Sequence, residues 1–121
     1  MRLQESGEMY LESIYVLSKQ LGAVRSIDIS EYMGYSKPSV SRAVSLLKSG
    51  GYIVMDEENL ITLTESGQEI AQKIYDRHTL LTRLLVRLGV PEKIAAEDAC
   101  RMEHTISDES FDAIRRHMEQ F

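Results

Sequence analysis

The segment Cys100-Arg101-Met102-Glu103-His104 brings together residue types that could do chemistry. On a helix, Cys100, Glu103 and His104 stand at positions i, i+3 and i+4, so their side chains share one face and can converge. Sulfur, carboxylate and imidazole donors together suit a divalent transition metal better than calcium or magnesium. Three ligands from one helix leave coordination positions open, so the segment predicts a metal site that other elements complete.

Two other segments offer further donors for such a site. Met9 and Glu12 lie three residues apart near the start of the chain, and His78 lies within its longest apolar-periodic stretch. Each residue alone has an ordinary explanation, because methionine and a lone cysteine usually fill cores and a glutamate is usually solvated. The metal hypothesis therefore depends on their occurrence together.

The same segment permits an enzymatic alternative, a thiol-dependent hydrolase with Cys100 as nucleophile and His104 as base. No oxyanion hole, third orienting residue or glycine-rich turn is evident around them. We therefore expect neither enzymatic activity nor a small-molecule substrate.

The elements that must position these residues follow from apolar periodicity and from residues that begin or end helices. Ser36 and Thr64 are suitable N-caps, Pro38 and Pro91 lie where helices should begin, and Gly34 should end a helix. The predicted helices cover Ser6–Leu21, Ser26 to about Met33, Ser36 to Gly50, Thr64 to about Leu88, Pro91 to about Ser107, and Ser107 to the end. Tyr52–Met55 and Leu60–Leu63 should form a β-hairpin.

A short helix, a tight turn, a polar-faced helix and then a hairpin is the order of a winged helix-turn-helix. The polar face of the second helix of the pair would enter the major groove of DNA, where small hydroxyl residues allow close approach and cations reach phosphate or guanine. The predicted DNA-binding residues are Lys37, Ser39, Ser41, Arg42, Ser45 and Lys48. The hairpin tip Asp56-Glu57-Glu58 is acidic, so we assign it no strong phosphate contact.

Composition restricts the class of protein. The 121 residues are 43% hydrophobic and 27% charged with a net charge of −5, so any DNA contact must come from a local basic patch. No apolar run approaches the ~20 residues that span a bilayer. The first residues, Met1 to Glu5, show no apolar signal core. We expect a cytoplasmic protein with no membrane partner.

Several motifs together resemble the diphtheria-toxin-repressor and manganese-transport-regulator family, and the resemblance covers essentially the whole chain. The matching stretches are Glu8 to Tyr15, Ser36 to Ser41, Leu63 to Gly67, Arg77-His78 and Cys100 to His104. The resemblance implies a mainly α protein, with a winged helix-turn-helix DNA-binding domain over residues 1–64 and a helical dimerisation and metal-binding domain over residues 65–121. It implies a metal-dependent transcriptional repressor that binds palindromic double-stranded DNA as a homodimer and controls metal-homeostasis genes.

The resemblance also implies ligand sets, and these are mixed. The iron-responsive branch uses the positions of Met9, Cys100, Glu103 and His104, with the position of His78 serving a neighbouring site. The manganese branch has aspartate at the Met9 position, glutamate at the Cys100 position and a ligand at the Glu12 position. Soft sulfur donors favour Fe²⁺, with Mn²⁺ next. Glu12, His78 and a shared Glu103 could complete a second site.

A winged-helix regulator of another class, a MarR-like sensor of a small organic ligand, is the main alternative. Such a regulator would bind DNA whether or not metal is present. It leaves the shared face of Cys100, Glu103 and His104 unexplained.

Overall fold

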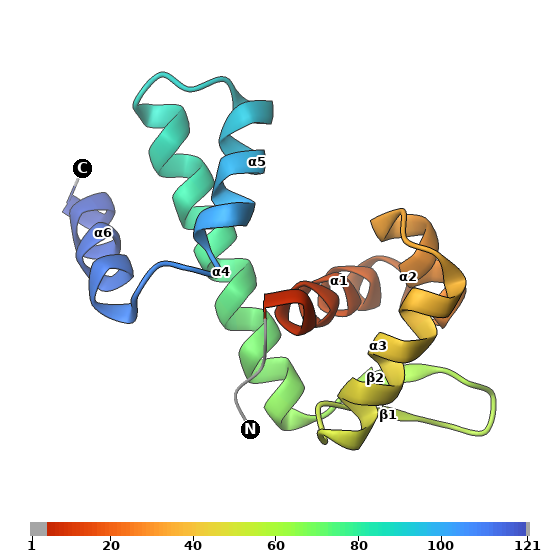
Figure 1. Ribbon diagram of the computed structural model, residues 1–121. Coiled ribbons are helices and arrows are strands. Elements are labelled where there is room, and N and C mark those ends of the chain that lie inside the picture. The colour runs from red at the N-terminus through yellow and green to blue at the C-terminus, as the bar shows by residue number, and fades with distance from the viewer. Residues whose placement is uncertain (1–4, 121) are drawn as a thin grey trace. The chain divides into compact units, whose positions relative to one another are not determined.

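The computed structural model describes residues 5–120 and is mainly helical, as the sequence predicts (Figure 1). Its contacts divide the chain into two compact units, residues 1–72 and 73–121. The division falls inside the long helix α4 (Glu65–Arg87), which therefore contributes one end to each unit.

The first unit holds three helices and a hairpin in the predicted order. The elements are α1 (Glu5–Leu21), α2 (Ser26–Met33), α3 (Lys37–Ser49), β1 (Ile53–Met55) and β2 (Ile61–Leu63). Gly34 ends α2 in the left-handed conformation at φ 72°, which costs glycine little. The Ser36 side chain accepts a hydrogen bond from the Ser39 amide at 3.3 Å, and Pro38 lies in the first turn of α3. These residues set the sharp turn between the two helices.

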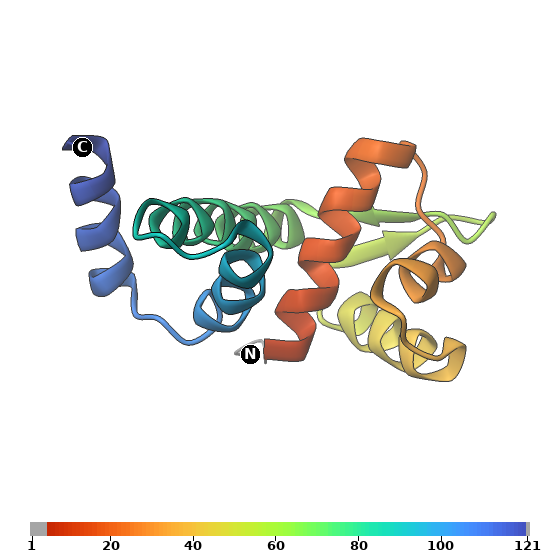
Figure 2. The ribbon, with the colours of Figure 1, turned by 90° about the horizontal axis from the view of Figure 1, so that it is seen from above.

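The hairpin forms an antiparallel wing, with Ile53 opposite Leu63. The Ile61 amide donates to the Val24 carbonyl at 2.8 Å, which ties the wing to the segment after α1. At the tip, the Asp56 carboxylate accepts hydrogen bonds from two backbone amides of the turn, each at 2.9 Å. The Asp56 carboxylate at the tip therefore stabilises the turn. Figure 2 shows the hairpin beside the helices of this unit.

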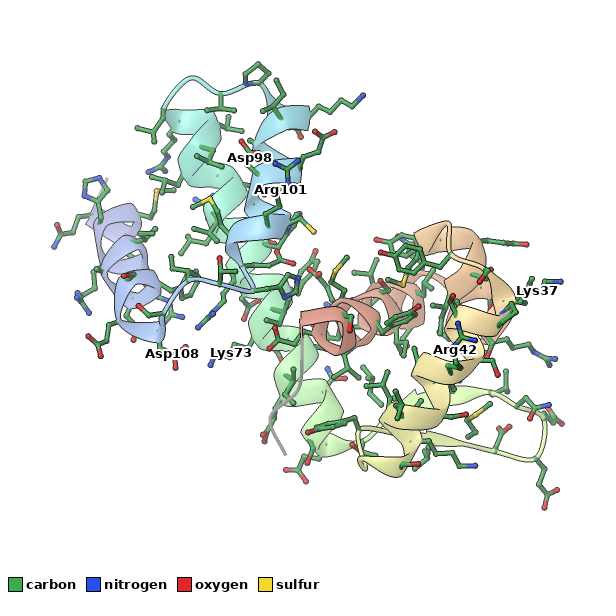
Figure 3. The ribbon with its side chains drawn as sticks, viewed as in Figure 1. Lys37, Arg42, Lys73, Asp98, Arg101 and Asp108 are labelled. Carbon is green, nitrogen blue, oxygen red and sulfur yellow. The ribbon has the colours of Figure 1, made fainter. Side chains whose placement is uncertain are left out.

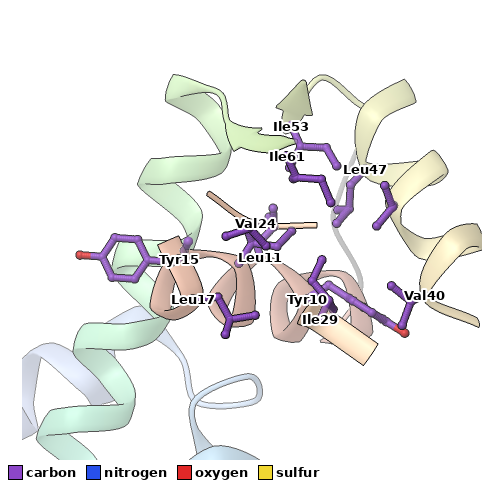
Figure 4. Packing of buried hydrophobic residues seen from close by; sticks show 13 residues of the cluster. Tyr10, Leu11, Tyr15, Leu17, Val24, Ile29, Val40, Leu47, Ile53 and Ile61 are labelled. Atoms are coloured by element: carbon purple, nitrogen blue, oxygen red, sulfur yellow. The ribbon is translucent and has the colours of Figure 1, made fainter. Parts of the chain in front are cut away.

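One apolar cluster holds this unit together (Figure 4). Its buried members come from all three helices, both strands and the start of α4: Tyr10, Leu11, Ile14, Tyr15, Leu17, Val24, Ile29, Val40, Val44, Leu47, Ile53, Ile61 and Ala71. Burial of each large aliphatic side chain contributes about 1.5–3 kcal/mol. The cluster therefore fixes one face of α3 and leaves its other face to solvent.

The join between the wing and α4 explains the segment Leu63 to Gly67. The Thr64 hydroxyl donates to the Gly51 carbonyl at 2.7 Å and accepts from the Gly67 amide at 3.2 Å, so Thr64 caps α4 as predicted. A Cβ atom on Gly67 would lie 2.0 Å from the Tyr52 carbonyl oxygen. Only glycine permits this close approach of α4 to the backbone just before β1.

The second unit contains the rest of α4 with α5 (Glu92–Met102) and α6 (Asp108–Gln120). Both ribbon views show α5 running beside α4. A small core joins the three helices through Leu81, Ala99 and Phe111. The Ser107 hydroxyl accepts from the Ser110 amide at 3.1 Å, so Ser107 caps the sixth helix.

Two sequence expectations about this unit are corrected. The fifth helix ends at Met102, although the periodicity predicts about Ser107. Leu88, which apolar periodicity would place on the buried stripe of the long helix with Leu81, is 71% exposed, and α4 ends at Arg87. The sixth helix reaches Gln120, and Phe121 lies outside the described residues. Among residues 5–120, no helix is both long and apolar enough to cross a membrane.

Candidate metal centre and nucleic-acid interface

Three of the predicted metal ligands converge at the end of α5. One ligand atom from each of Cys100, Glu103 and His104 lies within 4.8 Å of the others. The Glu103 and His104 side chains are fully buried, whereas Cys100 is partly exposed. A thiol, a carboxylate and an imidazole at this spacing fit a first-row transition metal, which binds sulfur, nitrogen and oxygen at about 2.0–2.3 Å.

The end of α5 shapes this cluster. Glu103 is the C-cap and keeps helical dihedral angles, φ −61° and ψ −26°, and its amide donates to the Ala99 carbonyl at 2.9 Å. The predicted i to i+3 relation of Cys100 and Glu103 therefore survives the early end of the helix. His104 lies in the following turn, where the amide of Ile106 returns to the Met102 carbonyl at 3.0 Å.

His78 on α4 joins the same cluster through Glu103. Its Nδ1 lies 2.9 Å from one carboxylate oxygen of Glu103, and Nε2 of His104 lies 3.2 Å from the other. Both carboxylate oxygens thus face an imidazole, and the carboxylate can contribute to two neighbouring cation positions.

Arg77, next to His78, is a further residue of this region, to which the sequence motifs assign no role. Its Nη1 donates to the carbonyl oxygens of Glu103 at 3.3 Å and Ile106 at 3.1 Å, and its Nη2 donates to Asp108. The sequence carries a signal for it, because Arg77 lies three residues after Ile74 and four before Leu81, on the buried stripe of α4. A cation on that stripe indicates a buried polar partner.

Asp108, the first residue of α6, is held by two cations. Lys73 Nζ lies 3.0 Å from its carboxylate, and Figure 3 shows the two side chains together. The hydrogen bond from Lys73 and its charge, with the charge of Arg77, hold the pKa of Asp108 below its usual value. The carboxylate is also well placed at a helix N-terminus, where the backbone dipole favours negative charge.

Met9 and Glu12 are located on α1, in the first unit. They lie one helical turn apart, and both side chains are partly buried. Their participation in metal binding stays a prediction.

The predicted DNA-binding face is α3, whose inner side packs into the core through Val40, Val44 and Leu47. On its outer side the exposed residues are Lys37, Ser41, Arg42, Ser45 and Lys48, and Figure 3 labels two of them. Ser39 is half-buried, and its hydroxyl bonds to the Ser36 hydroxyl at 2.9 Å. Ser39 therefore helps to cap the helix.

The outer face of α3 is locally basic within an acidic chain. The helix carries Lys37, Arg42 and Lys48 and no carboxylate. Such a face can approach DNA phosphates despite the net charge of −5. Leu46 on the same helix is apolar and 68% exposed, so it lies at the surface.

Comparison with known proteins matches two parts of the chain to two different protein domains. Residues 2–59 match the N-terminal DNA-binding domain of iron-dependent repressors, and residues 64–121 match their metal-binding and dimerisation domain. An HTH-type transcriptional regulator of Methanocaldococcus jannaschii is 35% identical over 98% of this chain and 97% of its own length. The transcriptional regulator MntR of Escherichia coli is 36% identical over 88% of this chain and 68% of its own length.

Solved structures agree with these matches. The manganese regulator SloR has a TM-score of 0.82 at 29% identity, over 98% of this chain and 55% of its own. IdeR of T. acidophilum has a TM-score of 0.83 at 25% identity, over 98% of this chain and 56% of its own. The chain thus spans about half the length of these two structures. The matches favour this class over the MarR-like alternative, and the chain belongs to the family of iron-dependent repressors that includes the manganese transport regulators.

Proposed function

We propose that the chain is a metal-activated transcriptional repressor, which binds palindromic operator DNA as a homodimer and controls genes of metal-ion homeostasis. The observation that supports this most is the convergence of the Cys100, Glu103 and His104 donor atoms within 4.8 Å at the end of α5. The chain also carries an exposed, carboxylate-free basic helix in its other unit. A sensor site and a DNA-reading surface are the two parts that such a repressor needs.

We assign the ligands as follows. Cys100, Glu103 and His104 hold the cation, and Met9 and Glu12 of α1 complete its coordination. The last two are assigned on donor type and on their spacing of one helical turn. His78 and Glu103 contribute to a second position. A bound divalent cation supplies the positive charge that offsets the carboxylates of this cluster.

Fe²⁺ is the proposed activator, with Mn²⁺ next. The Cys100 thiolate and the Met9 thioether are soft donors, which favour iron over the harder manganese ion. Two relatives point the other way by name, because one is a manganese regulator and another is MntR. The Glu12 and Glu103 carboxylates are the donors of this set that suit manganese.

The DNA contacts are assigned to α3. Lys37 and Arg42 near its N-terminal half reach base edges or phosphate, Ser41 and Ser45 allow close approach, and Lys48 meets phosphate. In a homodimer, two such helices about 34 Å apart would match successive major grooves of a palindromic operator.

Metal and DNA binding are coupled because the proposed ligands belong to both units. Met9 and Glu12 lie in the first unit, and Cys100, Glu103 and His104 in the second. Ligand residues on both units, held to one cation, restrict how the units move relative to each other. The population then shifts toward conformations that present α3 to DNA, without any metal–DNA contact.

The proposal is tested by elemental analysis of protein purified anaerobically, followed by selection of DNA from a random pool with each metal restored. We expect bound iron or manganese, and a selected palindrome that binds at least about 10-fold more tightly with metal than with chelator, a coupling of ordinary size. Cys100→Ala should retain the fold and lose most of this response. Equal DNA affinity with metal and with chelator would refute the proposal.

A further inference from the structure

Arg77 is a buried cation that the ligand set does not use. Only 6% of the residue is exposed, and its guanidinium carbon lies 5.3 Å from the centroid of the Phe111 ring. Burial of a charge is costly unless the charge is paired and hydrogen-bonded. Both Arg77 Nη atoms are hydrogen-bonded: Nη1 donates to two main-chain carbonyls, at the C-cap of α5 and in the turn after it, and Nη2 donates to the side-chain carboxylate of Asp108, the first residue of α6.

The main-chain acceptors of Arg77 lie at the end of α5 and in the turn that follows it. The last carbonyl groups of a helix have no intrahelical partner. Arg77 Nη1 donates to the carbonyls of Glu103 and Ile106, at 3.3 and 3.1 Å, and so binds both sides of His104. A planar guanidinium can donate to several acceptors in a fixed geometry, which a lysine ammonium cannot reproduce.

Glu103 is therefore held at both of its ends by consecutive residues of α4. Arg77 binds its main-chain carbonyl, and His78 Nδ1 lies 2.9 Å from its carboxylate. His104 follows directly in the chain, so the path of its backbone is set by the same contacts. Among the contacts described for residues 5–120, Arg77 reaches no proposed donor atom, yet it binds the backbone next to two of them.

We propose that Arg77 is a positioning residue of the metal centre, whose guanidinium clamps the turn carrying Glu103 and His104 so that their donors are in place before metal binds. This inference rests on the proposed function. Asp108 neutralises the guanidinium on the side of α6, and Lys73 contacts the outer face of that carboxylate at 3.0 Å. Lys73 is more than half exposed and does not reach the turn carbonyls among the contacts described, so it provides a matched control.

The test compares Arg77→Met, Arg77→Lys and Lys73→Met with the wild-type chain. Mn²⁺ affinity is measured by calorimetry, and amide hydrogen exchange of residues 103–108 is measured in metal-free protein. For Arg77→Met we expect an unchanged circular dichroism spectrum, Mn²⁺ binding weaker by about 10- to 100-fold, as for other residues that orient ligands, and faster exchange in the turn. Arg77→Lys should fall between it and the wild type, and Lys73→Met should match the wild type.

Co²⁺ absorption adds a readout that a general loss of stability would not change. Ligand-field bands report the geometry around cobalt, so Arg77→Met should shift them at saturating Co²⁺ while Lys73→Met should not. Wild-type Mn²⁺ affinity in Arg77→Met, or weaker binding with unchanged exchange and unchanged Co²⁺ bands, would overturn the inference alone. Unfolding of both Arg77 variants would also overturn it, by making Arg77 a folding residue. Absence of Mn²⁺ and Fe²⁺ binding in the wild-type chain would instead overturn the proposed function.

Discussion

The end of α5 and the outer face of α3 hold their charged groups in opposite ways. Around Glu103 the carboxylate is buried and contacted by two imidazoles, and the neighbouring backbone is bound by Arg77. On α3 the cations are exposed. Interactions between buried groups depend strongly on one another, whereas exposed charges act nearly independently and are screened by salt. The first arrangement suits an all-or-none sensor, and the second suits a DNA-reading surface whose contacts add up.

The largest effect that this comparison predicts comes from Glu103. Glu103→Gln removes a charged ligand from the buried cluster and should weaken Mn²⁺ binding by more than about 100-fold, beyond the usual effect of residues that only orient ligands. Calorimetry with Mn²⁺ measures it. Glu97→Gln is the matched control, since Glu97 is exposed on the same helix and loses the same charge. A similar loss in both variants would mean that Mn²⁺ binding depends only on net charge. The buried carboxylate would then not differ from an exposed one.

The next effect concerns Arg42. Arg42→Ala should cost about 1–3 kcal/mol of affinity for the selected DNA if the side chain reads a base edge, while Mn²⁺ binding remains unchanged. Fluorescence anisotropy with selected and scrambled DNA measures the loss and the change in specificity. Lys93→Ala, which removes an exposed cation from α5, serves as the charge control. A matching loss in Lys93→Ala would argue against α3 as the reading surface.

A smaller effect is expected at Lys48. As a phosphate contact it carries no sequence information, so Lys48→Ala should weaken selected and scrambled DNA equally. The slope of log affinity against log salt should become shallower by about 1. A loss confined to the selected sequence would instead place Lys48 at a base edge.

The smallest effect concerns the join of α5 and α6 at low pH. The pKa of Asp108 is lowered in the folded state by Lys73 and Arg77. Its contribution to stability is therefore complete above the ordinary aspartate value of about 3.9 and is lost as pH falls through the lower folded value. Urea unfolding of the wild type and Asp108→Asn between pH 6 and 2.5 should show a difference that shrinks below about pH 4. A difference that persists unchanged at the lowest pH would contradict this assignment.

The sequence predicts the winged helix well because its signals there are local. Ser36, Pro38 and Gly34 act on their own turns, and each has its expected place in the structure. The spacing of Cys100, Glu103 and His104 likewise predicts their convergence, since a single turn of backbone brings them together. Local rules are sufficient wherever the partners are close in the sequence.

The rest depends on contacts that are distant in the sequence. Helix α5 ends at Met102, and Arg77 donates hydrogen bonds to two carbonyls just beyond that end. Arg77 lies 26 and 29 residues before the residues that carry these carbonyls. The contact of His78 with Glu103 likewise joins residues that are 25 positions apart in the sequence. Leu46 and Leu88 are apolar and still exposed, because apolar periodicity does not reveal which side chains another element covers. Tertiary packing decides these features.

The proposed coupling of metal binding to DNA binding can be tested by thermodynamic linkage. If metal raises DNA affinity by a given factor, DNA must raise metal affinity by the same factor. The measurement is a Mn²⁺ titration of the protein with and without saturating selected DNA. We expect Mn²⁺ to bind more tightly when DNA is present, by the same factor by which Mn²⁺ raises the affinity for DNA. Identical Mn²⁺ affinity in the two titrations would contradict it.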